Sequence, residues 1–162
     1  MKKILLLFLF ILPVFLVGSI YYLDRECFLC PIQYTRDIII RSDSRGGGFF
    51  AAQRNGARTH QGLDLFAQIG TPVLAVRSGR VACANQNNGM GKYVIISHLD
   101  NMSTLYGHLS SIAVRNNEFV RQGQVIGRVG KTGNAGFRDI QPHLHFEVRV
   151  KGIAEDPLKY LS

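Results

Sequence analysis

Residues 142–150 carry the clearest alternation of hydrophobic and polar positions in the chain. The apolar positions are Leu144, Phe146, Val148 and Val150, and the polar positions between them are His143, His145, Glu147 and Arg149. Side chains of a strand point alternately to its two faces. The alternation therefore predicts a strand whose apolar face lies on a core and whose outer face carries two imidazoles, one strand repeat apart.

Short hydrophobic runs between turns rich in Gly and Asn predict further strands. These runs are residues 37–41, 72–76, 79–83, 93–98, 104–109 and 120–130. The Asn-Asn-Gly sequence at residues 87–89 is a strong hairpin signal. Alternation within 104–109 places Thr104, Tyr106 and His108 on one face. No helix is predicted after residue 23, so the expected fold class is all-β.

Residues 4–23 form an almost unbroken stretch of low polarity behind Lys2 and Lys3. Twenty helical residues span roughly 30 Å, about the thickness of a bilayer core. We therefore expect residues 1–23 to be a membrane-targeting helix. Small residues at 17–19 fit a cleaved signal peptide, whereas the Tyr pair at 21–22 favours a retained anchor. Under either interpretation the rest of the chain is exported to the periplasm or cell envelope. It stays anchored in the cytoplasmic membrane if the segment is retained, and it is secreted if the leader is cleaved.

Residues 24–48 are interpreted as a linker, and residues 49–162 as the main folded domain. Cys27 and Cys30 form a Cys-x-x-Cys pair in the linker. An exported pair of this kind can close as a disulfide. A redox role would need a thioredoxin-like βαβ context, and a zinc role a second Cys or His pair. Neither is visible, so a structural or idle pair is the interpretation; Cys83 is expected to be a small core residue.

The composition adds a basic charge to this picture. The formal net charge is +8; Lys2 and Lys3 supply two of the positive charges and residues 1–23 contain no acid, so the later residues carry +6. A basic domain suits an anionic partner such as nucleic acid, lipid headgroups or cell-wall polymers. The Arg residues are scattered and no nucleic-acid motif is present, which argues against nucleic acid.

His60 and Asp64 flank Gly62 and are the first candidates for metal chemistry. The glycine allows the backbone to bend so that both side chains can point at one place. Imidazole nitrogens together with one carboxylate make a sound zinc set. By itself the His-x-x-x-Asp spacing is weak evidence, since it also fits a capped turn.

Five motifs, in this order, resemble the lysostaphin-type (LytM-like) zinc metallopeptidases. They are His60-x-Gly62-x-Asp64, Gly70-Thr71-Pro72-Val73, Tyr106-Gly107-His108-Leu109, Gly123-Gln124-Val125-Ile126-Gly127 and residues 142–149. The resemblance covers residues 49–161. It implies an all-β peptidase domain of antiparallel sheets, groove-bearing and partly barrel-like, that hydrolyses peptide bonds of the bacterial cell wall.

The same resemblance assigns roles to five residues. The positions of the three zinc ligands are His60, Asp64 and His145, and those of the two catalytic histidines are His108 and His143. Three ligands leave a zinc position open for the attacking water. We expect His143 to be the general base, and His108 to bind the developing oxyanion or orient the water.

Two polar residues near these positions have open interpretations. His98 ends a predicted strand without a match in the family, and we expect it to be structural or groove-lining. Glu147 shares the polar face of His145. It either contacts a ligand histidine or is solvated.

The expected function is that of a zinc-dependent endopeptidase that hydrolyses the peptide cross-links of peptidoglycan. The sequence does not identify a regulatory protein partner. The alternative is a non-catalytic domain of the same fold that binds wall or regulates an amidase. All five site positions are filled, which favours the enzyme. The turns at 79–81 and 123–127 also resemble lipoyl- and biotin-carrying barrels. Such a carrier would use Lys92 in a hairpin turn, which the predicted export and the five site residues disfavour.

Overall fold

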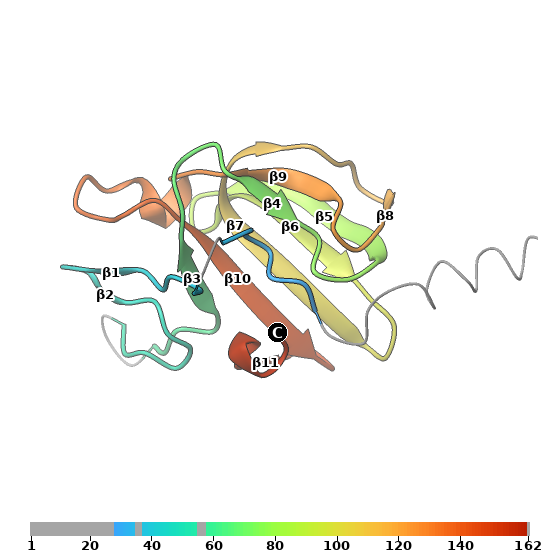
Figure 1. The fold of residues 1–162 in the computed structure, drawn as a ribbon, viewed down its shortest axis with the longest axis horizontal. Helices are drawn as coiled ribbons and strands as arrows, with labels where there is room; N and C mark the ends of the chain where they lie inside the picture. Colours follow the sequence, from blue (N-terminus) through green and yellow to red (C-terminus); the bar gives the residue numbers. More distant parts are fainter. Residues whose placement is uncertain (1–27, 35–36, 55–57, 162) are drawn as a thin grey trace, which may run out of the picture.

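The computed structural model describes residues 28–34, 37–54 and 58–161 (Figure 1). The strands are β1 (Ser42–Asp43), β2 (Gly46–Gly47), β3 (Leu63–Phe66), β4 (Pro72–Leu74), β5 (Gly79–Asn87), β6 (Gly91–Ser97), β7 (Met102–Ile112), β8 (Phe119–Val120), β9 (Val125–Val129), β10 (His143–Val150) and β11 (Ile153–Glu155). The helices of the described residues are two short 3₁₀ turns, η1 (Gly133–Gly136) and η2 (Pro157–Lys159). The prediction of an all-β, antiparallel fold is confirmed. The expected membrane helix at 1–23 lies outside the described residues, and within them no helix is long and apolar enough to cross a bilayer.

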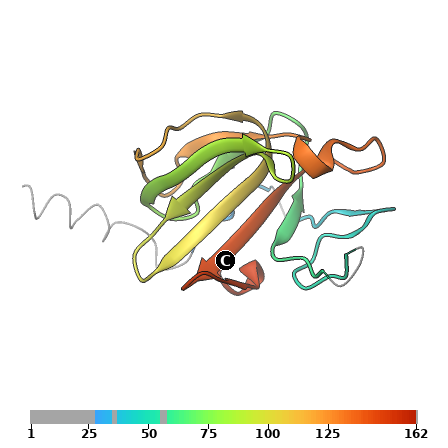
Figure 2. The ribbon, with the colours of Figure 1, turned by 180° about the vertical axis from the view of Figure 1, so that it is seen from behind.

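Nine strands form one large antiparallel sheet around the long strand β7. The order β11-β10-β7-β6-β5-β8 forms its main path, with β3 paired to β10, and β9 paired to both β7 and β4. Figures 1 and 2 show β10 running alongside β7. Residues 102–107 of β7 pair with β10, and residues 109–112 pair with β9.

The expected partly barrel-like closure is wrong. The strands β10 and β9 occupy successive parts of β7, so β9 and β4 branch from the sheet instead of closing it. Among the described strands, no pairing joins β8 or β4 back to β3 or β11. The result is an open, branched sheet, and the branch point lies at residues 107–109 of β7.

That branch point contains an irregularity centred on His108. Its φ of 61° lies in the left-handed region, which a residue with a side chain adopts only at a cost of about 1–3 kcal/mol. The registers of β6 and β9 against β7 both shift there. Tyr106 and Leu109, three apart, are both fully buried. The predicted face of His108, shared with Thr104 and Tyr106, is therefore wrong: the irregularity turns His108 away from the core.

The core lies under the apolar face of β10 and its neighbours. Leu144, Phe146 and Val148 are fully buried, as the alternation predicted, and the Tyr106 ring lies 5.4 Å from that of Phe146. The outer face is polar, as expected, but it is also buried: Glu147 is only 1% exposed, and the turn at Gly62 lies against Glu147 and His145.

The described residues of the predicted linker, 28–34 and 37–48, also contact the sheet. Phe28 and Ile32 are buried in the core, and the Phe28 ring stacks on Tyr160 at 5.5 Å. The predicted strand at 37–41 is wrong: Ile40 forms a single bridge to Leu65, and the short hairpin β1–β2 follows.

Replacing Ile32 tests whether the first described segment is part of the cooperative core. Ile32 is 1% exposed, so Ile32→Ala should lower the free energy of unfolding by about 2–5 kcal/mol. Ile39→Ala is the matched control, since Ile39 is 51% exposed and should change it by no more than about 0.5 kcal/mol. Urea unfolding monitored by circular dichroism measures the free energy of unfolding of both variants. Equal, small losses from the two variants would contradict the packing.

Candidate metal centre

Strand pairing sets two of the predicted ligands side by side. Asp64 in β3 is the register partner of His145 in β10, so the two side chains share one face. Gly62 allows the preceding turn to approach β10, because a Cβ there would lie 2.5 Å from the carbonyl oxygen of Phe146. His60 lies just before Gly62 in the sequence, and its side chain lies against Asp64 and His145.

Three potential ligand atoms converge at this point. His60 Nε2 lies 3.0 Å from Asp64 Oδ1 and 3.0 Å from His145 Nδ1, and the last two atoms are 2.8 Å apart. A tetrahedral zinc ion with bonds near 2.0–2.1 Å places its ligand atoms roughly 3.3 Å apart. The three side chains, which are all buried, need only a small expansion to reach that spacing.

Outer hydrogen bonds fix which nitrogen of each histidine faces the centre. His60 Nδ1 donates to the carbonyl of Phe49 at 2.8 Å, and His145 Nε2 donates to Glu147 Oε1 at 3.0 Å. The remaining nitrogens therefore present lone pairs to each other and to the Asp64 carboxylate. Three acceptors in this arrangement need a proton or a metal ion between them, and the N₂O donor set fits zinc. Of the two interpretations of Glu147, the structure shows the contact with a predicted ligand.

The electrostatics of the cluster also favour a positive charge. Burial disfavours a charged His145, but its hydrogen bonds to the Asp64 and Glu147 carboxylates outweigh this and raise its pKa to about 9. Burial similarly opposes ionisation of Asp64, yet hydrogen bonds from His145 and His60 hold its pKa well below the usual range. Without a metal ion, the cation beside the ionised Asp64 is therefore a protonated His145, and its Nδ1 must lose this proton before it can act as a ligand.

Two arginines, absent from the sequence prediction, occupy the second oxygen of Asp64. Arg41 donates to Oδ2 from Nε at 3.2 Å and from Nη2 at 3.1 Å, and Arg54 donates from Nη2 at 2.9 Å. Only Oδ1 is left to face the histidines. Neither arginine has a sequence signal that distinguishes it from the chain's many exposed arginines, because their burial depends on tertiary packing.

The two predicted catalytic histidines lie beside this centre. The ring centroids of His108 and His143 are 5.0 Å apart, and His143 Nε2 lies 3.9 Å from Asp64 Oδ1. His108 Nδ1 donates to the carbonyl of Thr132 at 2.9 Å, and His143 Nδ1 donates to that of Gln141 at 2.7 Å. Both Nε2 atoms are therefore free to accept a proton.

Burial keeps these two histidines neutral. It lowers the pKa of His143, and burial together with the neighbouring His145 and His143 lowers that of His108 to about 3. The structure thus brings all five predicted residues into one cluster, with two neutral imidazoles beside three potential ligands.

His98 lies outside the cluster. Its Nδ1 contacts the carbonyl of Ser78 at 2.9 Å and its Nε2 contacts Thr104 Oγ1 at 2.8 Å, next to the buried Tyr106 hydroxyl. This is a structural position, one of the two that the sequence left open. Lys92 belongs to strand β6 and donates to Ser110, which does not fit a carrier lysine in a hairpin turn.

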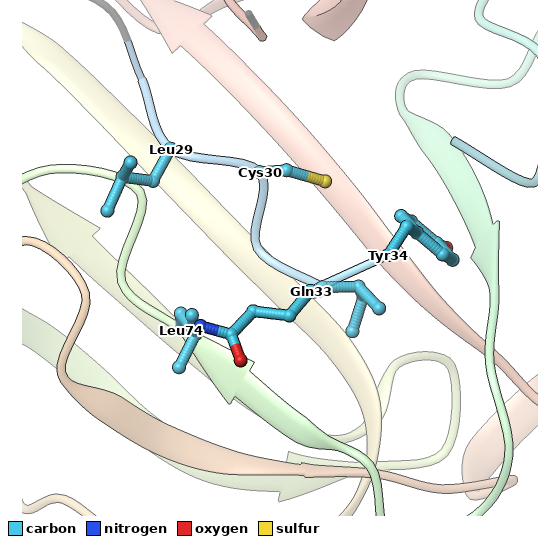
Figure 3. A pocket seen from close by; sticks show the side chains of 6 residues that line it. Leu29, Cys30, Gln33, Tyr34 and Leu74 are labelled. Carbon is cyan, nitrogen blue, oxygen red and sulfur yellow. The ribbon is translucent and has the colours of Figure 1, made fainter. Parts of the chain in front are cut away.

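Figure 3 shows a hollow elsewhere on the molecule. It is lined by Leu29, Cys30, Ile32, Gln33, Tyr34 and Leu74. The lining includes none of the five clustered residues, so the candidate chemistry lies in the histidine cluster.

Comparison with known proteins adds a family to this geometry. The sequence model of peptidase family M23 matches residues 58–157. Peptidoglycan DD-endopeptidase ShyC of Vibrio cholerae is 41% identical over 100 residues, 62% of this chain and 22% of ShyC. Murein hydrolase activator NlpD of Escherichia coli is 36% identical over 113 residues, 69% of this chain and 28% of NlpD. The chain thus spans only about a fifth to a quarter of these relatives.

Solved structures show the same fold. A zinc containing peptidase from Vibrio cholerae superposes with a TM-score of 0.66 at 30% identity, covering 81% of this chain and 39% of that one. The catalytic domain of lysostaphin from Staphylococcus simulans gives 0.62 at 32% identity, covering 73% of this chain and 91% of the domain. The resemblance to lysostaphin-type peptidases is confirmed.

The contact between Glu147 and His145 predicts an effect on metal affinity. Glu147→Gln removes the negative charge that holds the His145 Nε2 proton and should weaken zinc binding about 10- to 100-fold. Glu155→Gln is the matched control, because Glu155 lies in β11 and accepts from the Tyr160 hydroxyl at 2.7 Å. Competition with a chromogenic chelator measures both affinities. An unchanged affinity in Glu147→Gln would show that this contact does not support the ligand.

Proposed function

Because this chain belongs to peptidase family M23, we propose that it is a zinc-dependent endopeptidase that cleaves peptide cross-links of bacterial peptidoglycan. The observation that carries the proposal is the pair of neutral histidines beside the buried His60–Asp64–His145 cluster, each with Nε2 unprotonated. A regulator of the same fold would have no need of proton acceptors at this place.

The three clustered residues would hold zinc through His60 Nε2, Asp64 Oδ1 and His145 Nδ1. Bound zinc polarises the scissile carbonyl and lowers the pKa of water at its open position. The chain's other groups then complete the reaction. Glu147 and the carbonyl of Phe49 hold the ligand histidines in the required tautomers.

His143 serves as the general base in this proposal. Its Nε2 accepts the proton of the attacking water, and the imidazolium that forms is stabilised by Asp64 and by the hydrogen bond from Nδ1 to Gln141. The same proton is then available to the leaving amine.

His108 has the complementary task of orienting the water. With Nδ1–H donated to Thr132, the neutral ring offers only an acceptor at Nε2, which suits a water hydrogen. Binding the oxyanion would require a protonated His108, and the lowered pKa of about 3 opposes this. Of the two roles expected from the family, orientation of the water fits the described contacts better.

The substrate class and location are inferred from relatives and sequence. ShyC is named a peptidoglycan DD-endopeptidase, and the family match at residues 58–157 covers all five clustered residues. The low-polarity stretch at residues 4–23 supports export to the cell envelope and attachment to the membrane. The basic charge of the later residues suits an anionic wall polymer.

The second candidate is regulation of another wall hydrolase. The similarity to the murein hydrolase activator NlpD specifically supports it. The two functions differ in what the protein does alone: an endopeptidase releases fragments from wall by itself, whereas a regulator needs the partner amidase.

Digestion of purified peptidoglycan sacculi tests the enzyme proposal. The zinc-loaded full chain in mild detergent should convert cross-linked muropeptide dimers into monomers, and removal of the metal with a chelator should stop this. His143→Ala should lower the rate about 10²- to 10⁴-fold, because the proton acceptor is lost. Separation and mass measurement of the released muropeptides identify the bond that is cut.

The zinc content of the variant provides the control. His143→Ala leaves all three proposed ligands in place, so it should still bind one zinc ion per chain. A folded, zinc-loaded wild-type protein that releases nothing, yet stimulates a wall amidase, would replace the enzyme proposal by the regulatory one.

A further inference from the structure

A buried ion pair, formed by residues that precede the family match, links a proposed metal ligand to the proposed general base. Arg41 and Asp43 lie before residue 58, where the match begins. Arg41 Nη1 contacts Asp43 Oδ1 at 2.6 Å, and the side chains are only 4% and 7% exposed. Surface ion pairs contribute little, but a pair this buried is held in one geometry and constrains whatever else it touches.

Each member of this pair is linked to one proposed functional residue, Arg41 directly and Asp43 through the backbone of Gln141. Arg41 uses Nε and Nη2 on Asp64 Oδ2, the oxygen that faces away from the histidines. Asp43 uses Oδ2 to accept the backbone N–H of Gln141 at 2.9 Å. The carbonyl of that same Gln141 accepts from His143 Nδ1 at 2.7 Å. An unbroken series of hydrogen bonds thus runs from the metal ligand Asp64 to the proposed base His143.

The backbone holds this series in place. Arg41 N donates to the Asp64 carbonyl, Gly48 N donates to the Arg41 carbonyl and Asp64 N donates to the Gly48 carbonyl, at 2.8–2.9 Å. A Cβ on Gly48 would lie 2.7 Å from the Cβ of Asp64, so only glycine permits this approach. The hairpin β1–β2 is therefore fixed to β3 at both of its ends, through Arg41 and Gly48.

The planar guanidinium is required by this geometry. Arg41 directs two N–H groups to one carboxylate and a third N–H to another, with all three donors in a fixed plane. A lysine ammonium carries similar charge but is a single point, and it cannot reproduce the forked contact. Hydrogen bonds from Arg41 and from the backbone of Gln141 and Arg45 outweigh the burial of Asp43 and lower its pKa, which keeps it ionised.

We propose that Arg41 and Asp43 are positioning residues which set the orientation of the metal ligand Asp64 and of the base His143 through one shared ion pair. The roles of Asp64 and His143 in this statement rest on the proposed function. The proposal assigns to the segment before the family match a direct part in the chemistry. It also predicts different effects for the two residues: a change at Asp43 should alter the base alone, whereas a change at Arg41 should alter both metal binding and the base.

The test compares Asp43→Asn, Arg41→Lys and the control Asp139→Asn in the full chain. Asp139 also joins the hairpin to the 137–141 loop, through Arg45 at 2.6 Å, but its side chain is 46% exposed. The control therefore makes the same chemical change in an exposed contact between the same segments. Three kinds of measurement are made. They are the zinc affinity, the imidazole ¹⁵N shifts of His143 in the zinc-loaded protein, and the kinetics on muropeptide dimers, expressed as kcat and KM.

Asp43→Asn should act on the base alone. One of the two carboxylate oxygens becomes an NH₂ group, so the side chain can no longer accept from Arg41 at Oδ1 and from Gln141 at Oδ2. His143 should then lose its fixed Nδ1–H tautomer, and its two ¹⁵N shifts should move towards each other. We expect kcat to fall about tenfold with KM within about twofold, because the substrate contacts are unchanged. Zinc affinity should stay within about threefold, since Arg41 and Arg54 still hold Asp64.

Arg41→Lys should act on both ends. Zinc affinity should fall about tenfold through the loosened Asp64, and the His143 shifts should move as in Asp43→Asn. Asp139→Asn should leave the zinc affinity and the His143 shifts at their wild-type values. Because Arg41→Lys keeps the buried positive charge, it provides the test by itself if Asp43→Asn does not fold.

The two proposals fail in different ways. Wild-type zinc affinity and wild-type His143 shifts in both variants would overturn the positioning role, whether or not the protein hydrolyses peptidoglycan. A wild-type protein that binds zinc and shows the single His143 tautomer but cleaves nothing would overturn the proposed function, and would leave the shift and affinity comparisons as a valid test of the ion pair.

Discussion

The buried carboxylate of Asp64 is the group on which the rest of this structure depends. It lies in β3, the short strand beside β10, and is almost wholly removed from water. An ionised group in such a place must be compensated on every side. Two arginines satisfy its outer oxygen and two histidines its inner one, so that a single carboxylate determines where the hairpin segment, the turn before β3 and strand β10 must meet.

The branch point of the sheet, at His108 in β7, is a second place where tertiary contacts determine the position of a clustered residue. Strand β7 pairs with β10 along one part and with β9 along the next, and His108 sits where one pairing gives way to the other. A regular strand would have turned this side chain into the core with Tyr106. The left-handed conformation instead presents it to the cluster, so the local strain is offset by neighbouring strands that fit on either side of it.

The segment before the family match is part of this architecture. It contributes Phe28 and Ile32 to the core, Arg41 and Arg54 to the carboxylate, and the carbonyl of Phe49 to His60. A protein reduced to residues 58–157 would lack both arginines that contact Asp64 Oδ2. The similarity to family M23 therefore includes the clustered residues, and the segments that hold them in position begin earlier in the chain.

The sequence by itself determined the strand class, the inner face of β10 and the identity of the five residues that the structure brings into one cluster. Alternation, turn residues and short motifs are local properties, and they survive folding because each concerns only a few neighbouring positions. Only the tertiary structure decided the rest: the burial of the polar face of β10, the reversal of His108, the open edge of the sheet and the arginines on Asp64. These features arise where segments distant in the chain meet. Arg41 and Asp64 are 23 residues apart and Asp43 and Gln141 are 98 apart, and no local pattern records contacts of that range.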